Sequence, residues 1–458
     1  MSIATKTPII LPSETWAREF DAKLLLACCL AERGFPVYVG CKNTIHYNIT
    51  SFPAGLYLAK DFRVSSDLMF SIMKRLGFTI MAWDEEATLP FDQDEYHTIR
   101  ISKSAFSNVS AFFAWGPVNQ ETLQNAPYPV PGPVYLTGNP RRDMARPEVR
   151  GYFSEAAETL LARFGSFILI NSNFGKLNHF VNHEVVRPGD VDPGLRGNPN
   201  SPKFEKKGEL KLELYKHFLK LVPELAARFP DKQIIIRPHP SESHASWKEA
   251  GAGHDNVHVV YEGHVYPWIL ASDVMIHSGC TTGMESYLLD SPVISYQPVT
   301  SEQAAENLPN KLSHKVYDFD TLIEVVEEYV TGARALEKSA GLDALITPYI
   351  DSQEDRLASD QISRIIDEHE ANGQLRTHSA VHEKVIGWAS AKVRAAKKRR
   401  DWANPDHKSD LTFDGHRFPN LPLSDVSAGI ERFRRLLSRF DGVQATQVQD
   451  KVFLIEKT

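Results

Sequence analysis

The sequence is poor in cysteine, in long apolar runs and in positive charge, and each shortage argues against a class of protein. Of its four cysteines two are adjacent and none forms a C-x-x-C pair, which argues against a zinc site and a disulfide framework. No apolar run approaches the roughly 18–20 residues of a membrane span. The first eight residues lack the basic and apolar regions of a signal peptide. The net charge of −7 argues against general nucleic-acid binding. We therefore expect a cytoplasmic protein.

The sequence does contain a repeated alternation of short apolar strands and amphipathic helices, which predicts parallel, doubly wound sheets. A chain of 458 residues is also too long for one ordinary core. We predict an α/β protein of the GT-B type: Rossmann-like domains at 1–150 and 151–350 facing a cleft, then a mainly helical segment at 351–458. The expected strands lie at 9–11, 37–39, 78–83, 111–115, 134–136, 167–171, 233–236, 257–261, 274–276, 292–296 and 451–455.

The motif Arg-Pro-His-Pro at 237–240 directly follows one of these strands. Its prolines constrain the backbone at the strand exit. A guanidinium can clamp an anion and an imidazole can donate to a phosphate oxygen, so Arg237 and His239 are candidate donor-binding residues. The alternative is a turn that carries a surface histidine.

A second motif joins the strand at 274–276 to a helix through small and hydroxylated residues. The N–H groups of a helix start, together with Ser278, Gly279, Thr281 and Thr282, are typical of a phosphate cradle. The motif is neither a G-x-G-x-x-G nor a Walker loop. Glu285, one turn further on, is a candidate partner of ribose hydroxyls or simply an acid favourable to the helix dipole.

Three carboxylates, Asp84, Glu85 and Glu86, follow the strand at 78–83. Mutual repulsion is expected to raise the pKa of one of them towards that of a general base. The alternative is a solvated acidic loop.

Two D-x-D patterns resemble the metal motif of other glycosyltransferases. Asp92 and Asp94 do not directly follow an apolar strand, and Asp190 and Asp192 lie in a polar loop at 187–207. We interpret both as surface features and expect no metal.

Four further residues are candidate contacts of the donor or acceptor. Asn171 and Asn173 lie at a strand end, with ordinary turn asparagines as the alternative. Arg18 and Lys23, in the first helix, are candidates for an anionic acceptor or a sugar carboxylate, with surface ion pairs as the alternative.

An acidic pair at a strand end, followed much later by His-Pro, resembles motifs of bacterial sialyltransferases and Kdo transferases, GT-B enzymes that use CMP-activated sugars. The chain is more similar to the bacterial surface carbohydrate biosynthesis protein family. That similarity covers six segments in chain order: 11–23, 84–86, 138–141, 171–174, 237–240 and 277–283.

The resemblance implies that Glu85 or Glu86 is the general base and that His239 binds the CMP phosphate. Ser278, Thr281 and Thr282 would complete the phosphate site. Ala87 stands where the motif has glycine, which leaves the choice between the two glutamates open.

We therefore expect a glycosyltransferase that moves Kdo or a related nonulosonic acid from a CMP donor to a surface polysaccharide or lipid-linked glycan, such as lipopolysaccharide or capsule. A single phosphate needs little charge neutralisation, so no cofactor is expected. The alternatives are a CDP-glycerol-type glycerophosphotransferase, a UDP-sugar 2-epimerase and a non-catalytic nucleotide-sugar-binding scaffold.

A basic segment at 392–400, flanked by Trp388 and Trp402, is expected to be helical. Attraction to an anionic leaflet is worth about 1 kcal/mol per basic residue near the surface. This predicts peripheral contact with the inner face of the cytoplasmic membrane; the alternative is a solvated helix face.

Overall fold

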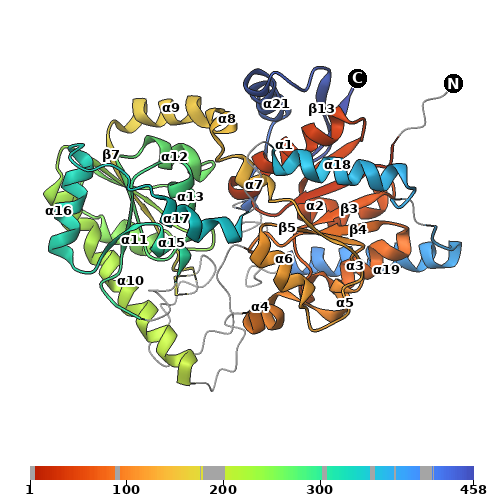
Figure 1. Ribbon diagram of the computed structural model, residues 1–458, viewed down its shortest axis with the longest axis horizontal. Coiled ribbons are helices and arrows are strands. Elements are labelled where there is room, and N and C mark those ends of the chain that lie inside the picture. Colours follow the sequence, from red (N-terminus) through yellow and green to blue (C-terminus); the bar gives the residue numbers. More distant parts are fainter. Residues whose placement is uncertain are drawn as a thin grey trace. The chain divides into compact units, whose positions relative to one another are not determined.

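The computed structural model describes residues 6–87, 93–175, 177–178, 202–301, 307–350, 356–375, 378–402, 415 and 417–458. The chain forms two compact units (Figure 1). Unit 1 comprises Met1–Tyr152 and Ile346–Thr458, and unit 2 comprises Phe153–Leu345. The last hundred or so residues, expected as a separate helical segment, thus belong to unit 1.

Unit 1 is built on an eight-stranded sheet with the order β13-β14-β2-β1-β3-β4-β5-β6. The run from β2 to β6 is parallel, whereas β14 pairs antiparallel with both β2 and β13. The strands are β1 (Ile9–Ser13), β2 (Val37–Cys41), β3 (Leu56–Ala59), β4 (Thr79–Ala82), β5 (Ala111–Ala114), β6 (Val134–Leu136), β13 (Val443–Gln449) and β14 (Val452–Lys457).

The helices of unit 1 follow the strands as the alternating pattern predicts. They are α1 (Trp16–Glu32), α2 (Lys42–Tyr47), α3 (Asp67–Leu76), α4 (Gln93–Arg100), α5 (Lys103–Phe106), α6 (Pro117–Gln124), α7 (Pro140–Asp143), α8 (Pro147–Arg150), α18 (Ala358–Ala371), α19 (Val381–Trp402) and α21 (Leu423–Leu437). The Asp143 carboxylate accepts hydrogen bonds of 2.8 Å from the backbone N–H groups of Ala358 and Ser359. This contact ties the C-terminal segment to the rest of unit 1.

Unit 2 has a six-stranded, fully parallel sheet with the order β12-β11-β10-β7-β8-β9. Its strands are β7 (Phe167–Asn171), β8 (Gln233–Arg237), β9 (Val257–Val259), β10 (Val274–His277), β11 (Val293–Tyr296) and β12 (His314–Val316). Its helices are α9 (Ser154–Phe164), α10 (Pro202–Arg228), α11 (Ala245–Ala250), α12 (Val265–Ala271), α13 (Thr281–Leu288), α15 (Leu308–Lys311), α16 (Phe319–Val330) and α17 (Ala340–Ile346).

The predicted α/β class, with two Rossmann-like units of parallel strands, is confirmed. Within the described ranges, three strands were not predicted: β3, β12 and β13. The apolar run of β3 has only four residues, β12 is His-Lys-Val with a single apolar residue, and β13 is largely polar and exposed, so none of them shows a clear strand pattern. Helix α10 begins at Pro202, within the predicted polar loop. Among the described residues no helix is long and apolar enough to cross a membrane.

Each sheet has one point where the strand order reverses. In unit 1 the chain goes from β1 to β2 on one side and returns to β3 on the other. In unit 2 it goes from β7 through β8 and β9, then returns to β10 on the opposite side of β7. Ligands of open α/β sheets bind outside the carboxyl ends of the strands at such a switch point. We therefore expect ligand-binding residues at the carboxyl ends of β1 and β3 in unit 1, and of β7 and β10 in unit 2.

Candidate functional site

The start of α13 lies at the switch point of unit 2, where the chain leaves β10. Gly279 has a φ of +71°, which favours glycine, and the helix N-cap, Cys280, makes no side-chain capping hydrogen bond. The hydroxyl oxygens of Ser278 and Thr282 are buried and have no hydrogen-bond partner among the described residues. Buried hydroxyls without a partner carry a desolvation cost, which a bound polar group removes. This is the arrangement expected of a phosphate site.

Two other residues named for this site lie on the same helix. Thr281 is its first residue and is half-buried. Glu285 lies one turn further along and is buried, with 7% of its surface exposed. Its place inside the helix layer supports a packing role at least as well as contact with a ribose.

His277 and Gly283 pack against each other beneath the N-terminus of α13 and hold this turn in place. The imidazole is fully buried; its Nε2 donates to Ser313 Oγ (2.8 Å), and its Nδ1 accepts from the N–H of Cys280 (3.3 Å). The Ser313 hydroxyl itself donates to the carbonyl of Pro309, which fixes this tautomer. Burial lowers the pKa of His277 to about 3, so the ring is neutral. A Cβ at Gly283 would lie 2.4 Å from His277 Nε2, so the close passage of α13 requires glycine.

His277 should make the stability of the protein depend on pH. Its pKa is about 3 in the folded protein and near 6.5 in an unfolded chain, so it contributes stability above pH 6.5 that is lost as the pH falls towards 3. Between pH 6.5 and 4 the free energy of unfolding should depend less steeply on pH in His277→Asn than in the wild type. The two slopes should differ by about 1.4 kcal/mol per pH unit. Chemical denaturation at several pH values measures this.

The exposed His382, changed to Asn, is the matched control and should leave the slope as it is in the wild type. Equal slopes in wild type and His277→Asn would show that the buried ring is not neutral.

Glu242 holds the loops after β7 and β8 together. Its carboxylate is fully buried and lies between two loops and α11. It accepts hydrogen bonds from Ser172 Oγ (2.8 Å), Phe174 N (2.7 Å) and His239 N (3.2 Å) on Oε1, and from Trp247 Nε1 (3.0 Å) on Oε2. Burial raises its pKa, although these hydrogen bonds oppose the shift. Glu242 has no role predicted from the sequence, because an acid in a Pro- and Ser-rich turn resembles a solvated one.

His239 is oriented by the turn that follows it. Its Nδ1 accepts from the backbone N–H of Ser241 (3.2 Å), and the Ser241 hydroxyl lies 2.8 Å away. A backbone N–H can only donate, so the proton of the neutral ring is on Nε2. A Cβ at Gly175 would lie 2.0 Å from Ser241 Oγ, so the loop after β7 passes directly against this turn. The arrangement gives His239 one N–H donor of fixed direction.

Arg237 does not have the predicted role of an anion clamp. Its Nη1 and Nη2 donate to the carbonyls of Glu262 (2.6 Å) and Gly263 (3.1 Å), and its guanidinium lies 4.9 Å from the Trp268 ring centre. Burial lowers its pKa to about 10. That prediction was wrong because the last side chain of β8 turns towards α12, where both terminal nitrogens of its guanidinium are bonded to carbonyl oxygens.

Asn171 and Asn173 both lie at the switch point of unit 2. The Asn171 amide donates to Met275 Sδ (2.9 Å), and its Oδ1 is buried without a partner among the described residues. Asn173 Nδ2 donates to the carbonyl of Ser278 (3.4 Å). The two asparagines thus join the end of β7 to the end of β10, beside the predicted phosphate site.

Unit 1 gathers charged side chains at the carboxyl ends of its parallel strands. Glu14 follows β1, Lys42 follows β2, and Lys60 follows β3. Glu14 Oε2 lies 2.5 Å from Lys60 Nζ and 3.4 Å from Lys42 Nζ, and its Oε1 pairs with Arg417. Burial would raise the pKa of Glu14, but these cations hold it well below its usual range. This group was not predicted from the sequence, because it consists of single charges at the ends of strands far apart in the chain.

Glu85 is buried beside this group, with 3% of its surface exposed. Its Oε1 accepts from Trp83 Nε1 (2.9 Å) and pairs with Lys23 Nζ (3.1 Å). Its Oε2 is buried and has no hydrogen-bond partner among the described residues. Glu85 therefore has one oxygen fixed by two partners and the other buried without a partner among the described residues.

Lys23 is not available to an acceptor or a sugar carboxylate, contrary to the prediction. Besides Glu85, its ammonium contacts Glu19 Oε2 (2.7 Å) and the carbonyl of Pro12 (2.7 Å), which uses all three of its donors. It is 2% exposed. A lysine on the inner face of α1 fixes the carboxylate of Glu85.

Glu86 forms an ion pair of 3.1 Å with Arg18. Arg18 therefore has the alternative role considered for it, that of an ion-pair partner. Burial would raise the pKa of Glu86, but Arg18, Arg141, Arg100 and Lys60 more than offset this and bring it to about 2. The predicted raised pKa is therefore wrong for Glu86, because cations from other elements outweigh repulsion between neighbours in sequence.

Asp84 stabilises the loop after β4. Both of its oxygens pair with Arg100, and Oδ1 also accepts from the N–H of Glu86 (3.1 Å). It is 1% exposed.

Neither D-x-D pattern gains support as a metal site. Asp94 is exposed in the first turn of α4, and Asp92, Asp190 and Asp192 lie outside the described residues. Within the described ranges no group of three His, Cys, Asp or Glu side chains could hold a metal ion.

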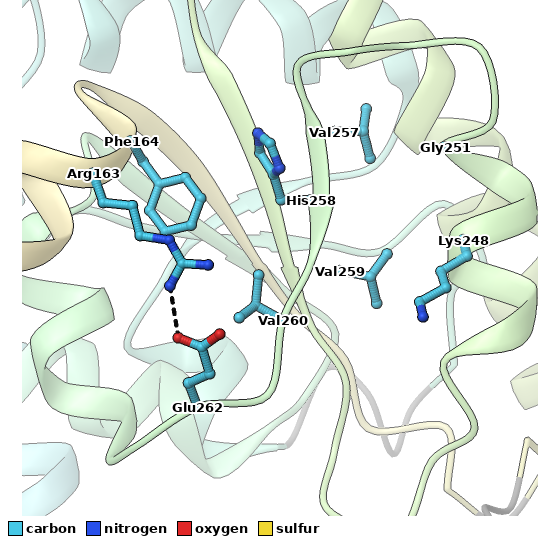
Figure 2. A pocket seen from close by; sticks show the side chains of 9 residues that line it. All are labelled: Arg163, Phe164, Lys248, Gly251, Val257, His258, Val259, Val260 and Glu262. Atoms are coloured by element: carbon cyan, nitrogen blue, oxygen red, sulfur yellow. Dashed lines mark hydrogen bonds and ion pairs between the residues drawn. The ribbon is translucent and has the colours of Figure 1, made fainter.

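A hollow of about 360 Å³ lies along the edge strand β9 of unit 2 (Figure 2). Arg163 and Glu262 form an ion pair of 2.8 Å at one side of it. None of the candidate residues lines it: its walls are Arg163, Phe164, Lys248, Gly251, Val257, His258, Val259, Val260 and Glu262. The strand ends and this hollow are therefore separate features.

No protein-family model and no curated protein matches the chain. Similar solved structures include a single-residue variant of the wall teichoic acid polymerase TagF, with 11% identity, a TM-score of 0.49 and coverage of 81% of this chain and 90% of that chain. The UDP-GlcNAc 2-epimerase of Methanocaldococcus jannaschii has 13% identity, a TM-score of 0.46 and coverage of 79% and 99%. The S. aureus MnaA–UDP structure has 12% identity, a TM-score of 0.47 and coverage of 81% and 98%.

Similarities of this size do not transfer an activity. None of these three is named as a Kdo transferase or a sialyltransferase, so the resemblance to those families stays a prediction.

Proposed function

We propose that this protein is a transferase of surface glycan synthesis that binds the phosphate of a nucleotide-activated donor at the start of α13. The observation that carries the proposal is the pair of buried, unpartnered hydroxyls of Ser278 and Thr282 at a helix N-terminus without a side-chain cap, in the part of the chain that the structure describes. A helix N-terminus offers free N–H groups and a partial positive charge to an anion. Its place at the switch point of unit 2 is where such sheets bind their ligands.

The donor we propose is a CMP-activated acidic sugar, Kdo or another nonulosonic acid. Its single phosphate carries less charge than a diphosphate. The N–H groups of α13, the two hydroxyls and His239 Nε2 can therefore stabilise the departing CMP. The carboxylate beside the anomeric carbon favours departure through an oxocarbenium-like state. His239 would donate to a phosphate oxygen as negative charge develops there.

We propose Glu85 as the general base, in preference to Glu86. A base needs a carboxylate oxygen that can reach the acceptor hydroxyl, and Glu85 Oε2 has no partner among the described residues. Glu86 is paired with Arg18 and, with a pKa of about 2, is a weak base. The glycan acceptor is part of this proposal.

Nucleotide selectivity tests the donor. CMP should bind in EDTA at least about tenfold more tightly than UDP, because the cradle takes one phosphate and needs no metal. Calorimetric titration of CMP, CDP and UDP into the whole chain measures this. The Ser278→Ala variant should lose about tenfold in CMP affinity, whereas Ser246→Ala, on α11, is the control and should not. A metal requirement or a preference for UDP would overturn the CMP proposal.

Turnover distinguishes the alternatives. Hydrolysis without acceptor should be seen with CMP-Kdo or a CMP-nonulosonic acid. Turnover of CDP-glycerol alone would indicate a glycerophosphotransferase, and interconversion of UDP-GlcNAc an epimerase. Binding of CMP with no turnover of any donor would indicate a scaffold.

A further inference from the structure

Helix α19 packs on unit 1 through one narrow side. It lies beside α3 (Figure 1). Its buried residues are small, Gly387, Ala391 and Ala395, and a Cβ at Gly387 would lie 2.9 Å from Arg75 Cβ. An ion pair between Arg75 and Glu383 adds to this contact. The exposed large apolar side chains of α19 are therefore not what holds it on the protein.

On the outward side of α19, large apolar residues occur from Val381 to Val393. This reverses the usual pattern, in which a surface helix buries its large apolar side chains and exposes its polar ones. Five large apolar residues are exposed, a concentration that marks an interaction site. They are Val381 (79%), Val385 (60%), Ile386 (44%), Trp388 (53%) and Val393 (71%).

The second half of α19 is strongly basic. The helix has seven Lys or Arg residues and two acidic ones. Lys397, Arg399 and Arg400 are exposed. Lys392 Nζ lies 5.6 Å from the ring centre of Trp388, so the basic and apolar parts meet on the outward side.

We infer that the outward side of α19 binds an anionic lipid surface. Valine, isoleucine and tryptophan side chains enter the boundary between headgroups and acyl chains, and lysine and arginine lie at the level of anionic headgroups. A two-fold contact between copies of this chain would instead bring two basic helix halves into one interface, because such interfaces use the same patch twice. The inference goes beyond donor chemistry and does not depend on the identity of the donor.

Vesicle co-sedimentation tests the charge requirement. The whole chain should bind vesicles of phosphatidylcholine containing about one-third phosphatidylglycerol and not vesicles of phosphatidylcholine alone. Changing Lys397, Arg399 and Arg400 together to Gln should weaken binding on the order of 100-fold, since each contributes about 1 kcal/mol. The control changes three exposed lysines of unit 2 to Gln, Lys220, Lys248 and Lys315, and should bind as the wild type does.

The apolar requirement is tested separately. Trp388→Ser with Val393→Ser should weaken binding at least about tenfold, whereas Val64→Ser, equally exposed on unit 1, should not. All four cysteines are buried, so the single accessible thiol introduced by Ala389→Cys can be labelled selectively with an environment-sensitive dye. Its emission should shift to the blue on anionic vesicles, and that of a dye attached to the Val64→Cys variant should not.

Three results would overturn the inference: no binding to anionic vesicles, equal binding by the α19 variants and the controls, or a dimer in solution that these variants dissociate. CMP affinity, measured on the same proteins without vesicles, should be unchanged in every variant. Failure of the donor proposal would therefore appear in that measurement alone.

Discussion

Replacing Glu85 by Gln should lower the rate of transfer by a factor on the order of 10²–10⁴ while leaving CMP affinity unchanged. The amide keeps the shape and accepts from Trp83 Nε1 as the carboxylate does, but it cannot take a proton. Lys23 keeps Glu19 and the carbonyl of Pro12 as partners, so the buried ammonium is not left alone. Single-turnover transfer rates and calorimetric CMP titration measure the two quantities.

Two neighbours are the controls for Glu85. Glu86→Gln removes an acid that is already paired with Arg18, so it should reduce transfer far less. Asp84→Asn breaks a buried pair with Arg100 and should lower the melting temperature more than the rate per folded molecule. Transfer that is unchanged in Glu85→Gln would move the base elsewhere. Loss of CMP binding in the same variant would mean that Glu85 touches the donor.

Replacing His239 by Ala should weaken the transition state by roughly 2–4 kcal/mol, which is a loss of about 30- to 1000-fold in turnover. The fold should survive, because Glu242 holds the loop through the backbone N–H of residue 239 and does not use the imidazole. The rate of donor hydrolysis at saturating donor measures the effect.

A graded pair of controls separates the chemistry of His239 from its orientation. Ser241→Ala removes the hydroxyl beside Nδ1 but keeps the backbone N–H contact, so it should cost less than the loss of the ring. His258→Ala removes a half-buried histidine that contacts Gln233 on the edge strand, and should leave turnover unchanged. Wild-type turnover in His239→Ala would show that the imidazole does not stabilise the leaving phosphate.

The sequence by itself determined most of the elements and the residue types of the turn after β10. Apolar runs and helical periodicity fix which segments are buried strands and which are helices, because burial of apolar surface acts along a few consecutive residues. The proposed cradle is local for the same reason: Ser278, Gly279 and Thr282 are neighbours in the chain, and a strand, a tight turn and a helix start need no distant partner to form this turn.

Only the tertiary structure decided how the charged residues are used. Glu14 meets Lys42 and Lys60 because β1 lies between β2 and β3, an order that no local pattern contains. The pKa of Glu86 falls because arginines from other segments outweigh the adjacent acids. Electrostatic interaction and desolvation depend on distance in space and on burial. The roles of charged residues therefore follow from strand order, whereas the elements that carry them follow from the sequence.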